Sequence, residues 1–136
     1  MTTPALVRDF YDRLWNRGDE GAAPELLTAD FVFRGSLGDA MHGREAFLEY
    51  VRAVRGSLSD YHCEIVLCLS EDPHAFARMR FSGIHTAPFL RHAPTRKPVS
   101  WEGAALFTFR REHIAELWVM GDVAGLEAQL RANAVE

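Results

Sequence analysis

The sequence predicts an α+β fold in which about three helices pack on a curved antiparallel sheet and enclose a cone-shaped cavity. The first half of the chain carries apolar residues at helical spacing, whereas the second half carries long apolar segments separated by short turns. Helices followed by hairpin-connected strands are typical of an antiparallel sheet with helices on one face. Such a bent, covered sheet leaves a concave apolar space, where small-molecule sites are usually built.

Three helices are expected in the first half of the chain, over residues 3–18, 22–27 and 43–56. The first has a good start because Thr3 precedes Pro4, and Gly18 ends it. Its apolar residues form a broad stripe at helical spacing: Leu6, Val7, Phe10, Tyr11, Leu14 and Trp15. A strand is expected over residues 31–34, between the second and third helices.

Four strands are expected in the second half, over residues 61–69, 75–84, 98–109 and 114–120. Short polar turns join the first strand to the second and the third to the fourth. The segment between the second and third strands is a longer loop that contains Pro88 and Pro94. After the last strand, Asp122 is followed by a segment that can form a short terminal helix.

Length and composition fit one domain over residues 1–136. Apolar residues make up 48% of the chain, which is enough for a substantial core. Lysine and arginine total 15 against 19 acidic residues, so the basic surface of a nucleic-acid binder is missing. The sequence has no signal-peptide pattern and no segment of membrane-spanning length. We therefore expect a cytoplasmic protein that binds neither nucleic acid nor membranes.

The cysteines and histidines give no sign of a metal site. Cys63 and Cys68 lie in one expected strand, and their odd separation would point them to opposite faces. A disulfide or shared metal between them is not expected, and both thiols are expected to be reduced and buried. His62, His74 and His113 have no ligand-like spacing to other donors. No glycine-rich phosphate loop is present either, so no metal and no cofactor are predicted.

The main chemical signal is Asp122, which follows an apolar strand. A carboxylate in apolar surroundings has a raised pKa and can act as a general acid or base near neutral pH. The alternative is structural, because an aspartate directly before Val123 is a good N-cap for the terminal helix. His85 ends a strand on the same face as Phe81 and could stabilise a substrate oxygen. Its alternative is a structural histidine bonded to the long loop.

Candidates for a substrate pocket come mainly from strand faces. Trp118 and Met120 share strand parity with Asp122. A second set on the preceding strand shares a parity of its own: Trp101, Gly103, Ala105 and Phe107. Ordinary core packing is the alternative for both sets. The full set of pocket candidates is Trp15, Phe33, Trp101, Ala105, Phe107, Trp118 and Met120.

The order of elements and three segments resemble the SnoaL-like polyketide and ester cyclase family, within the nuclear transport factor 2-like superfamily. The segments are His42–Glu45, Ser82–Thr86 with Pro94-Thr95 in the following loop, and Glu116–Leu130. The resemblance covers nearly the whole chain. It implies ring closure by an aldol reaction without metal or cofactor, in which Asp122 exchanges a proton with a carbon acid.

Two positions depart from the aromatic polyketide cyclases of that family. Ala105 stands where those enzymes carry a pocket histidine, and Phe33 stands where they carry a pocket asparagine. Two polar groups that would hold a polyketide's oxygens are therefore missing.

The leading hypothesis is a cofactor-independent enzyme that acts on a small apolar, carbonyl-bearing metabolite, with Asp122 as acid and base and His85 assisting. Epoxide opening is an alternative, with Glu116 as a second carboxylate beside Arg78 or Arg80. Dehydration or isomerisation uses similar parts. A non-catalytic ligand-binding or dimerisation module is a further alternative.

A homodimer is expected in every case because the open sheet face needs cover. The apolar residues assigned to that face are Val66, Phe109, Leu117 and Val119.

Overall fold

The structure is a computed structural model that describes residues 3–36 and 39–134. The helical elements are α1 (Ala5–Asp9), the π-helix η1 (Phe10–Asn16), the 3₁₀ turn η2 (Glu20–Ala22), α2 (Ala23–Leu26), α3 (Arg44–Ser57) and α4 (Val123–Asn133). The strands are β1 (Leu27–Arg34), β2 (Met41–His42), β3 (Leu58–Glu71), β4 (His74–His85), β5 (Pro98–Arg110) and β6 (His113–Gly121). The predicted α+β fold class is confirmed.

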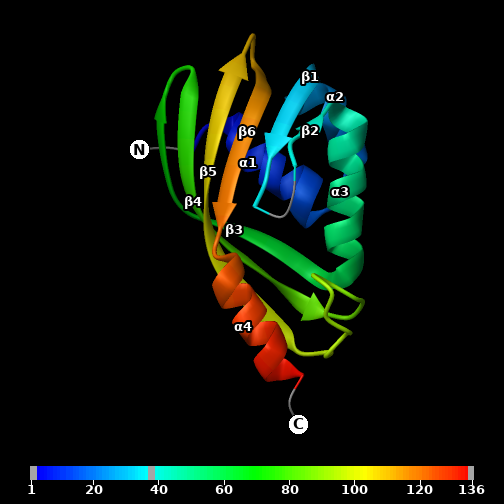
Figure 1. Cartoon of the computed structure of the whole chain (residues 1–136). Helices are drawn as coiled ribbons and strands as arrows, with labels where there is room; N and C mark the ends of the chain where they lie inside the picture. Colours follow the sequence, from blue (N-terminus) through cyan, green and yellow to red (C-terminus); the bar gives the residue numbers. More distant parts are fainter. Residues whose placement is uncertain (1–2, 37–38, 135–136) are drawn as a thin grey trace.

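The six strands form one sheet in the order β2-β1-β6-β5-β4-β3. Neighbouring strands are antiparallel except β1 and β6, which run parallel. Figure 1 shows that the long strands β3 and β4 bend strongly, while α3 stands across the space that the bent sheet leaves. The expected curved sheet is therefore present, and β1 joins it through one parallel pair that the local sequence pattern does not reveal.

A bulge in β3 decides where the two cysteines lie. Pairing with β4 shifts register between Ile65 and Leu67, so Val66 is an extra residue on β3. Cys63 and Cys68 are consequently both buried, at 3% and 7% exposed, and both thiols are free. The prediction of opposite faces is wrong, because it assumed an uninterrupted alternation of side chains along the strand.

The first expected helix changes its winding midway. After the short α1 the chain continues as the π-helix η1, which buries four of its seven residues: Phe10, Tyr11, Leu14 and Trp15. At its end the Asn16 side chain donates to the carbonyl oxygen of Cys63 at 3.1 Å and accepts from the Cys63 N–H at 2.7 Å. Arg55 of α3 donates to the carbonyl oxygens of Trp15 and Asn16. These bonds fix η1 between the sheet and α3.

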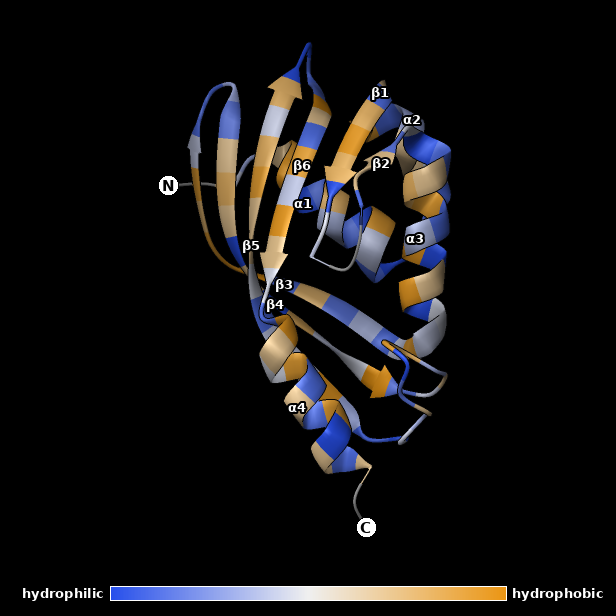
Figure 2. Ribbon diagram, in the orientation of Figure 1, coloured by the Kyte–Doolittle hydropathy of each residue, from blue (hydrophilic) through white to orange (hydrophobic). Residues whose placement is uncertain are grey.

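The helix α3 buries one face and exposes the other. Phe47, Val51 and Val54 point into the core, and Figure 2 shows the resulting alternation of hydrophobic and hydrophilic bands along this helix. The terminal helix α4 docks at the start of β5, where the Gln129 side chain bonds both the N–H and the carbonyl oxygen of Ser100. Within the two described ranges, no helix combines the length and apolar character needed to cross a membrane.

Candidate functional site

An aromatic cavity lies between η1, α3, the inner face of the bent sheet and the start of α4. Eight of its fifteen lining residues are aromatic, and none of the fifteen has a charged side chain. The cavity is narrow, since the space open to the centre of a water molecule is about 50 Å³. A ring-bearing ligand therefore enters only if aromatic side chains turn aside. The lining favours an uncharged ligand, because an ion would lose its hydration there without gaining a partner.

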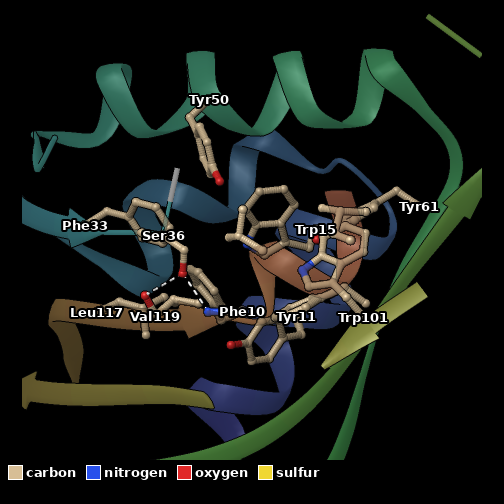
Figure 3. Close-up of a pocket in the computed structure, with 15 residues that line it drawn as sticks. Phe10, Tyr11, Trp15, Phe33, Ser36, Tyr50, Tyr61, Trp101, Leu117 and Val119 are labelled. Carbon is tan, nitrogen blue, oxygen red and sulfur yellow. Dashed lines mark hydrogen bonds between the residues drawn. The ribbon is translucent and has the colours of Figure 1, made fainter. Parts of the chain in front are cut away.

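Three tyrosines contribute to the cavity wall: Tyr11 from η1, Tyr50 from α3 and Tyr61 from β3. Burial raises the pKa of all three phenols, to about 12 for Tyr50, so each stays a protonated hydrogen-bond donor at neutral pH. Figure 3 shows the Tyr50 hydroxyl pointing from α3 into the cavity. The Tyr11 hydroxyl is sealed from solvent and has no hydrogen-bond partner among the described residues.

Ser36 closes one side of the cavity, where β1 ends next to β6. Its hydroxyl donates to the carbonyl oxygen of Val119 at 3.2 Å and accepts from the N–H of Gly121 at 2.6 Å, as the dashed lines in Figure 3 show. Both bonds join the segment after β1 to the end of β6. The Ser36 hydroxyl is thus committed to the backbone rather than free for a ligand.

Asp122 lies at the edge of this cavity but does not line it. Its neighbours Gly121 and Val123 are lining residues, whereas Asp122 itself is exposed. The carboxylate accepts a hydrogen bond of 2.9 Å from the N–H of Gly125 and so caps α4. This geometry is that of the structural alternative, and the role of Asp122 in proton exchange stays a prediction.

Trp118 and Met120 do not belong to the cavity, which corrects the sequence-based assignment. They are 42% and 58% exposed and lie on the outer face of the sheet. The inner face of β6 is formed by Leu117 and Val119, which line the cavity. Trp118 and Met120 do share one face of β6, but that face is the outer one.

His85 is fully buried and forms hydrogen bonds to the long loop between β4 and β5. Its Nδ1 accepts from the N–H of Thr95 at 3.3 Å and lies 3.2 Å from the Thr95 hydroxyl. Its backbone accepts from the N–H of Arg96 and donates to the carbonyl oxygen of Lys97. His85 is not among the residues that line the cavity. The structure therefore places it as the loop-anchoring histidine, and an assisting role in catalysis has no geometric support.

Of the remaining pocket candidates, three line the cavity and two do not. Trp15, Phe33 and Trp101 are lining residues. Ala105 and Phe107 lie on the inner face of β5 but are completely buried in the core. Phe107 packs edge-on against the rings of η1, with a centroid distance of 5.6 Å to Phe10. The residues of η1 cover Phe107 on the inner face of β5, which the strand pattern alone does not show.

Sequence patterns do not distinguish the cavity tyrosines Tyr50 and Tyr61 from ordinary core residues. Tyr50 lies three residues after Phe47 and four before Val54, both of which point into the core, so helical spacing already placed it on the inner face. Tyr61 has the same strand parity as the buried Cys63. The spacing of both tyrosines indicates that they face inward, but an inward-facing tyrosine is more often an ordinary core residue than part of a ligand site.

A family model for SnoaL-like polyketide cyclases matches residues 5–130. The chain belongs to this family. The resemblance inferred from the sequence is therefore confirmed, and family membership supports an enzyme of the cyclase or isomerase type. No curated protein is significantly similar in sequence.

Solved structures show the fold of this SnoaL-like domain. A candidate SnoaL-like polyketide cyclase from Jannaschia sp. CCS1 is 19% identical with a TM-score of 0.84, covering 96% of this chain and 90% of that one. TsrD from Streptomyces laurentii is 23% identical with a TM-score of 0.81, covering 97% and 99%. A hypothetical protein from Catenulispora acidiphila, solved with trimethylamine, is 21% identical with a TM-score of 0.80, covering 96% and 95%. The last is described as having a ketosteroid isomerase-like fold.

In this SnoaL-like domain the second carboxylate considered for epoxide opening is not in the cavity. Glu116 is exposed on the outer face of the sheet. Arg78 pairs with Glu102 at 2.9 Å and Arg80 with Glu64 at 3.3 Å, all on that same face. The epoxide alternative therefore loses its support. In residues 3–36 and 39–134, no three histidine, cysteine or carboxylate side chains gather where they could hold a metal ion.

Proposed function

We propose that this SnoaL-like domain is a cofactor-independent enzyme that closes a ring in an apolar, carbonyl-bearing metabolite by an aldol-type reaction. The observation that carries the proposal is the aromatic cavity with tyrosine hydroxyls in its wall. An apolar cavity binds such a molecule by burying its surface, and hydrogen-bond donors in a dry site stabilise an oxyanion more than they do in water. That this protein is cytoplasmic stays a prediction.

The reaction needs a base and an oxyanion donor. The base removes a proton from the carbon beside one carbonyl, and the resulting enolate carbon attacks a second carbonyl of the same molecule. One carbon–carbon bond forms, and the new alkoxide takes up a proton, so no atom is lost and no electron acceptor is required. Phenol hydroxyls in the cavity wall supply donors for the enolate oxygen.

Asp122 is the nearest candidate for the base, because both of its chain neighbours line the cavity. To reach a substrate, its carboxylate has to leave the N–H of Gly125 and turn inward. Losing an N-cap costs about 1 kcal/mol, and because the cavity offers an ion no charged partner, the carboxylate approaches the substrate at the cavity edge and does not enter the cavity. A ligand that offers an acidic C–H group at the cavity edge favours the inward orientation.

Deuterium exchange into 2-tetralone tests the proton-abstraction step without the natural substrate. This small flat ketone has an acidic C–H group beside its carbonyl, and exchange in D₂O is followed by NMR. We expect the wild-type chain to accelerate exchange and the Asp122→Asn variant to lose about 100-fold or more of that acceleration. Asp12→Asn, at an exposed position on η1, is the matched control. No acceleration by the wild type, or full activity of Asp122→Asn, contradicts the proposal.

A non-catalytic ligand-binding module is the second candidate, because none of the lining residues carries a charge. In that case the cavity binds an apolar compound and returns it chemically unchanged. The Asp122→Asn variant would then bind 2-tetralone as tightly as the wild type, and neither protein would accelerate exchange.

A further inference from the structure

We infer that the hydroxyl of Tyr50 donates the hydrogen bond that holds the carbonyl oxygen of the ligand, and that the cavity selects flat, uncharged carbonyl compounds. The inference rests on the proposed function in taking the aromatic cavity as the site. It adds the residue that orients the ligand and the chemical class of the part of the ligand that enters.

The orientation of Tyr50 is the first argument. The side chain leaves α3 and directs its hydroxyl into the cavity (Figure 3). The ring is held on two sides: its centroid lies 5.9 Å from the Trp15 ring at an interplanar angle of 88°, and 5.3 Å from the Phe33 ring at 39°. In the free protein these two neighbours restrict the plane of the phenol, so its hydroxyl already points into the cavity before wall side chains turn aside for a ligand.

The other hydroxyls of the cavity are less available. Ser36 already bonds the backbone of Val119 and Gly121. Tyr11 packs edge-on against Phe107, and its oxygen is sealed from solvent. Tyr61 is a buried residue that lies beside the thiol of Cys63. Tyr50 is the hydroxyl that combines an inward direction with only partial burial.

The protonation state of Tyr50 suits a donor rather than a base. Desolvation raises its pKa to about 12, so at neutral pH the phenol keeps its proton. A neutral phenol among aromatic rings binds a neutral carbonyl oxygen, and its hydrogen bond strengthens as that oxygen gains negative charge.

The lining also defines what the cavity rejects. None of the described lining residues is cationic, so a carboxylate or phosphate would be buried without a partner, at a cost of several kcal/mol. Aromatic walls instead favour the faces and edges of a flat ring system. Any anionic group of the natural ligand must therefore stay outside the cavity while the carbonyl end enters.

The test uses 2-tetralone labelled with ¹³C at its carbonyl. Infrared spectroscopy of the bound probe reports hydrogen bonding directly, because the C=O stretch falls when the oxygen accepts a hydrogen bond. Quenching of tryptophan fluorescence reports affinity, since Trp15 and Trp101 line the cavity. For Tyr50→Phe we expect about 3- to 10-fold weaker binding and a C=O stretch near the value in an apolar solvent. Tyr61→Phe is the matched control and should leave the stretch unchanged.

The outcomes separate the inference from the proposed function. If the wild type binds 2-tetralone but Tyr50→Phe changes neither the stretch nor the affinity, the assignment of Tyr50 is wrong and the proposed function stands. If Tyr61→Phe moves the stretch instead, the donor is Tyr61 and the assignment is again wrong. If the wild type does not bind the probe, the cavity is not a site for flat ketones, and both the inference and the proposed function are overturned. Circular dichroism checks that each variant is folded.

Discussion

The carboxylate of Asp122 accepts a hydrogen bond of 2.9 Å from the backbone N–H of Gly125 and so caps α4. A Cβ at Gly125 would collide with this carboxylate, so the small residue is what lets the aspartate bend back over the first turn. The residue that family resemblance names as the proton carrier is therefore also the start of the terminal helix.

Substitutions of Asp122 should separate its structural contribution from its chemistry. We expect Asp122→Ala to lower the free energy of unfolding by about 1 kcal/mol, whereas Asp122→Asn changes it little because asparagine caps nearly as well. Urea denaturation measures both values. A loss in Asp122→Asn as large as in Asp122→Ala would show that the cap needs the charge, and activity data on Asp122→Asn would then need correction for stability.

Phe33 and Phe107 should respond differently to shortening. Phe107 is completely buried and does not line the cavity, so Phe107→Leu is expected to cost about 1–2 kcal/mol of unfolding free energy without changing affinity for 2-tetralone. Phe33 lines the cavity, so Phe33→Leu should change that affinity. Urea denaturation and fluorescence titration of both variants test the distinction. It fails if Phe107→Leu alters binding more than Phe33→Leu does.

Stability should fall at alkaline pH because buried thiols and phenols are held neutral in the folded chain, and Cys63 and Tyr50 are two of them. Burial raises the pKa of the Cys63 thiol from 9.0 to about 12 and that of the Tyr50 phenol from 10.0 to about 12. Both groups ionise more readily in the unfolded chain, so their contribution is complete below about pH 9 and is lost as the pH rises toward 12.

Urea denaturation at a series of alkaline pH values measures this slope. The Cys63→Ala variant should show a shallower fall just above pH 9, where thiols titrate in the unfolded chain before phenols do. Equal slopes for the variant and the wild type would mean that Cys63 does not contribute.

The homodimer stays a prediction, but the structure indicates a different set of interface residues from the one expected from the sequence. Leu117 is buried and Val119 lines the cavity, so neither covers the open sheet face. A row of exposed apolar side chains instead crosses that face in register over four strands: Leu69, Phe76, Leu106 and Trp118. A contiguous apolar patch of this kind favours association with a second copy.

A lysine in the centre of that row tests the dimer. We expect light scattering after size exclusion to give twice the chain mass for the wild type and the monomer mass for Leu106→Lys. Ser100→Lys, which lies at another exposed position of the same strand, should stay dimeric. A wild-type monomer, or a dimeric Leu106→Lys variant, contradicts the prediction.

Local patterns predicted the elements well because periodicity is a local property. Helical and strand spacing predicted most of β3 to β6 and α3, and the order of these elements predicted a concave space between a bent sheet and the helices. It was harder to predict which face of each strand points into the core. Val66 is an extra residue that reverses the alternation along β3, and nothing near it in sequence signals a bulge. For β6, parity grouped Trp118 with Met120 correctly, but only the position of η1 and α3 decides which side is inside.

The predicted catalytic role of Asp122 depends even more on where the folded chain places its carboxylate. A carboxylate after an apolar strand looks alike in sequence whether it faces a cavity or caps a helix, and the structure places Asp122 as a cap. Tyr50 is the opposite case: its helical spacing to Phe47 and Val54 is that of a core residue, and that spacing does not show that the hydroxyl points into the cavity.

Methyl NMR tests most directly the central claim that the aromatic cavity is the ligand site. Leu117 and Leu126 line the cavity, whereas Leu67, Leu69 and Leu106 are exposed on the outer face. With leucine methyls labelled and 2-tetralone added, we predict saturable shifts for the Leu117 and Leu126 methyls and none for the outer three. Shifts confined to the outer leucines would place binding on the open sheet face and contradict the account.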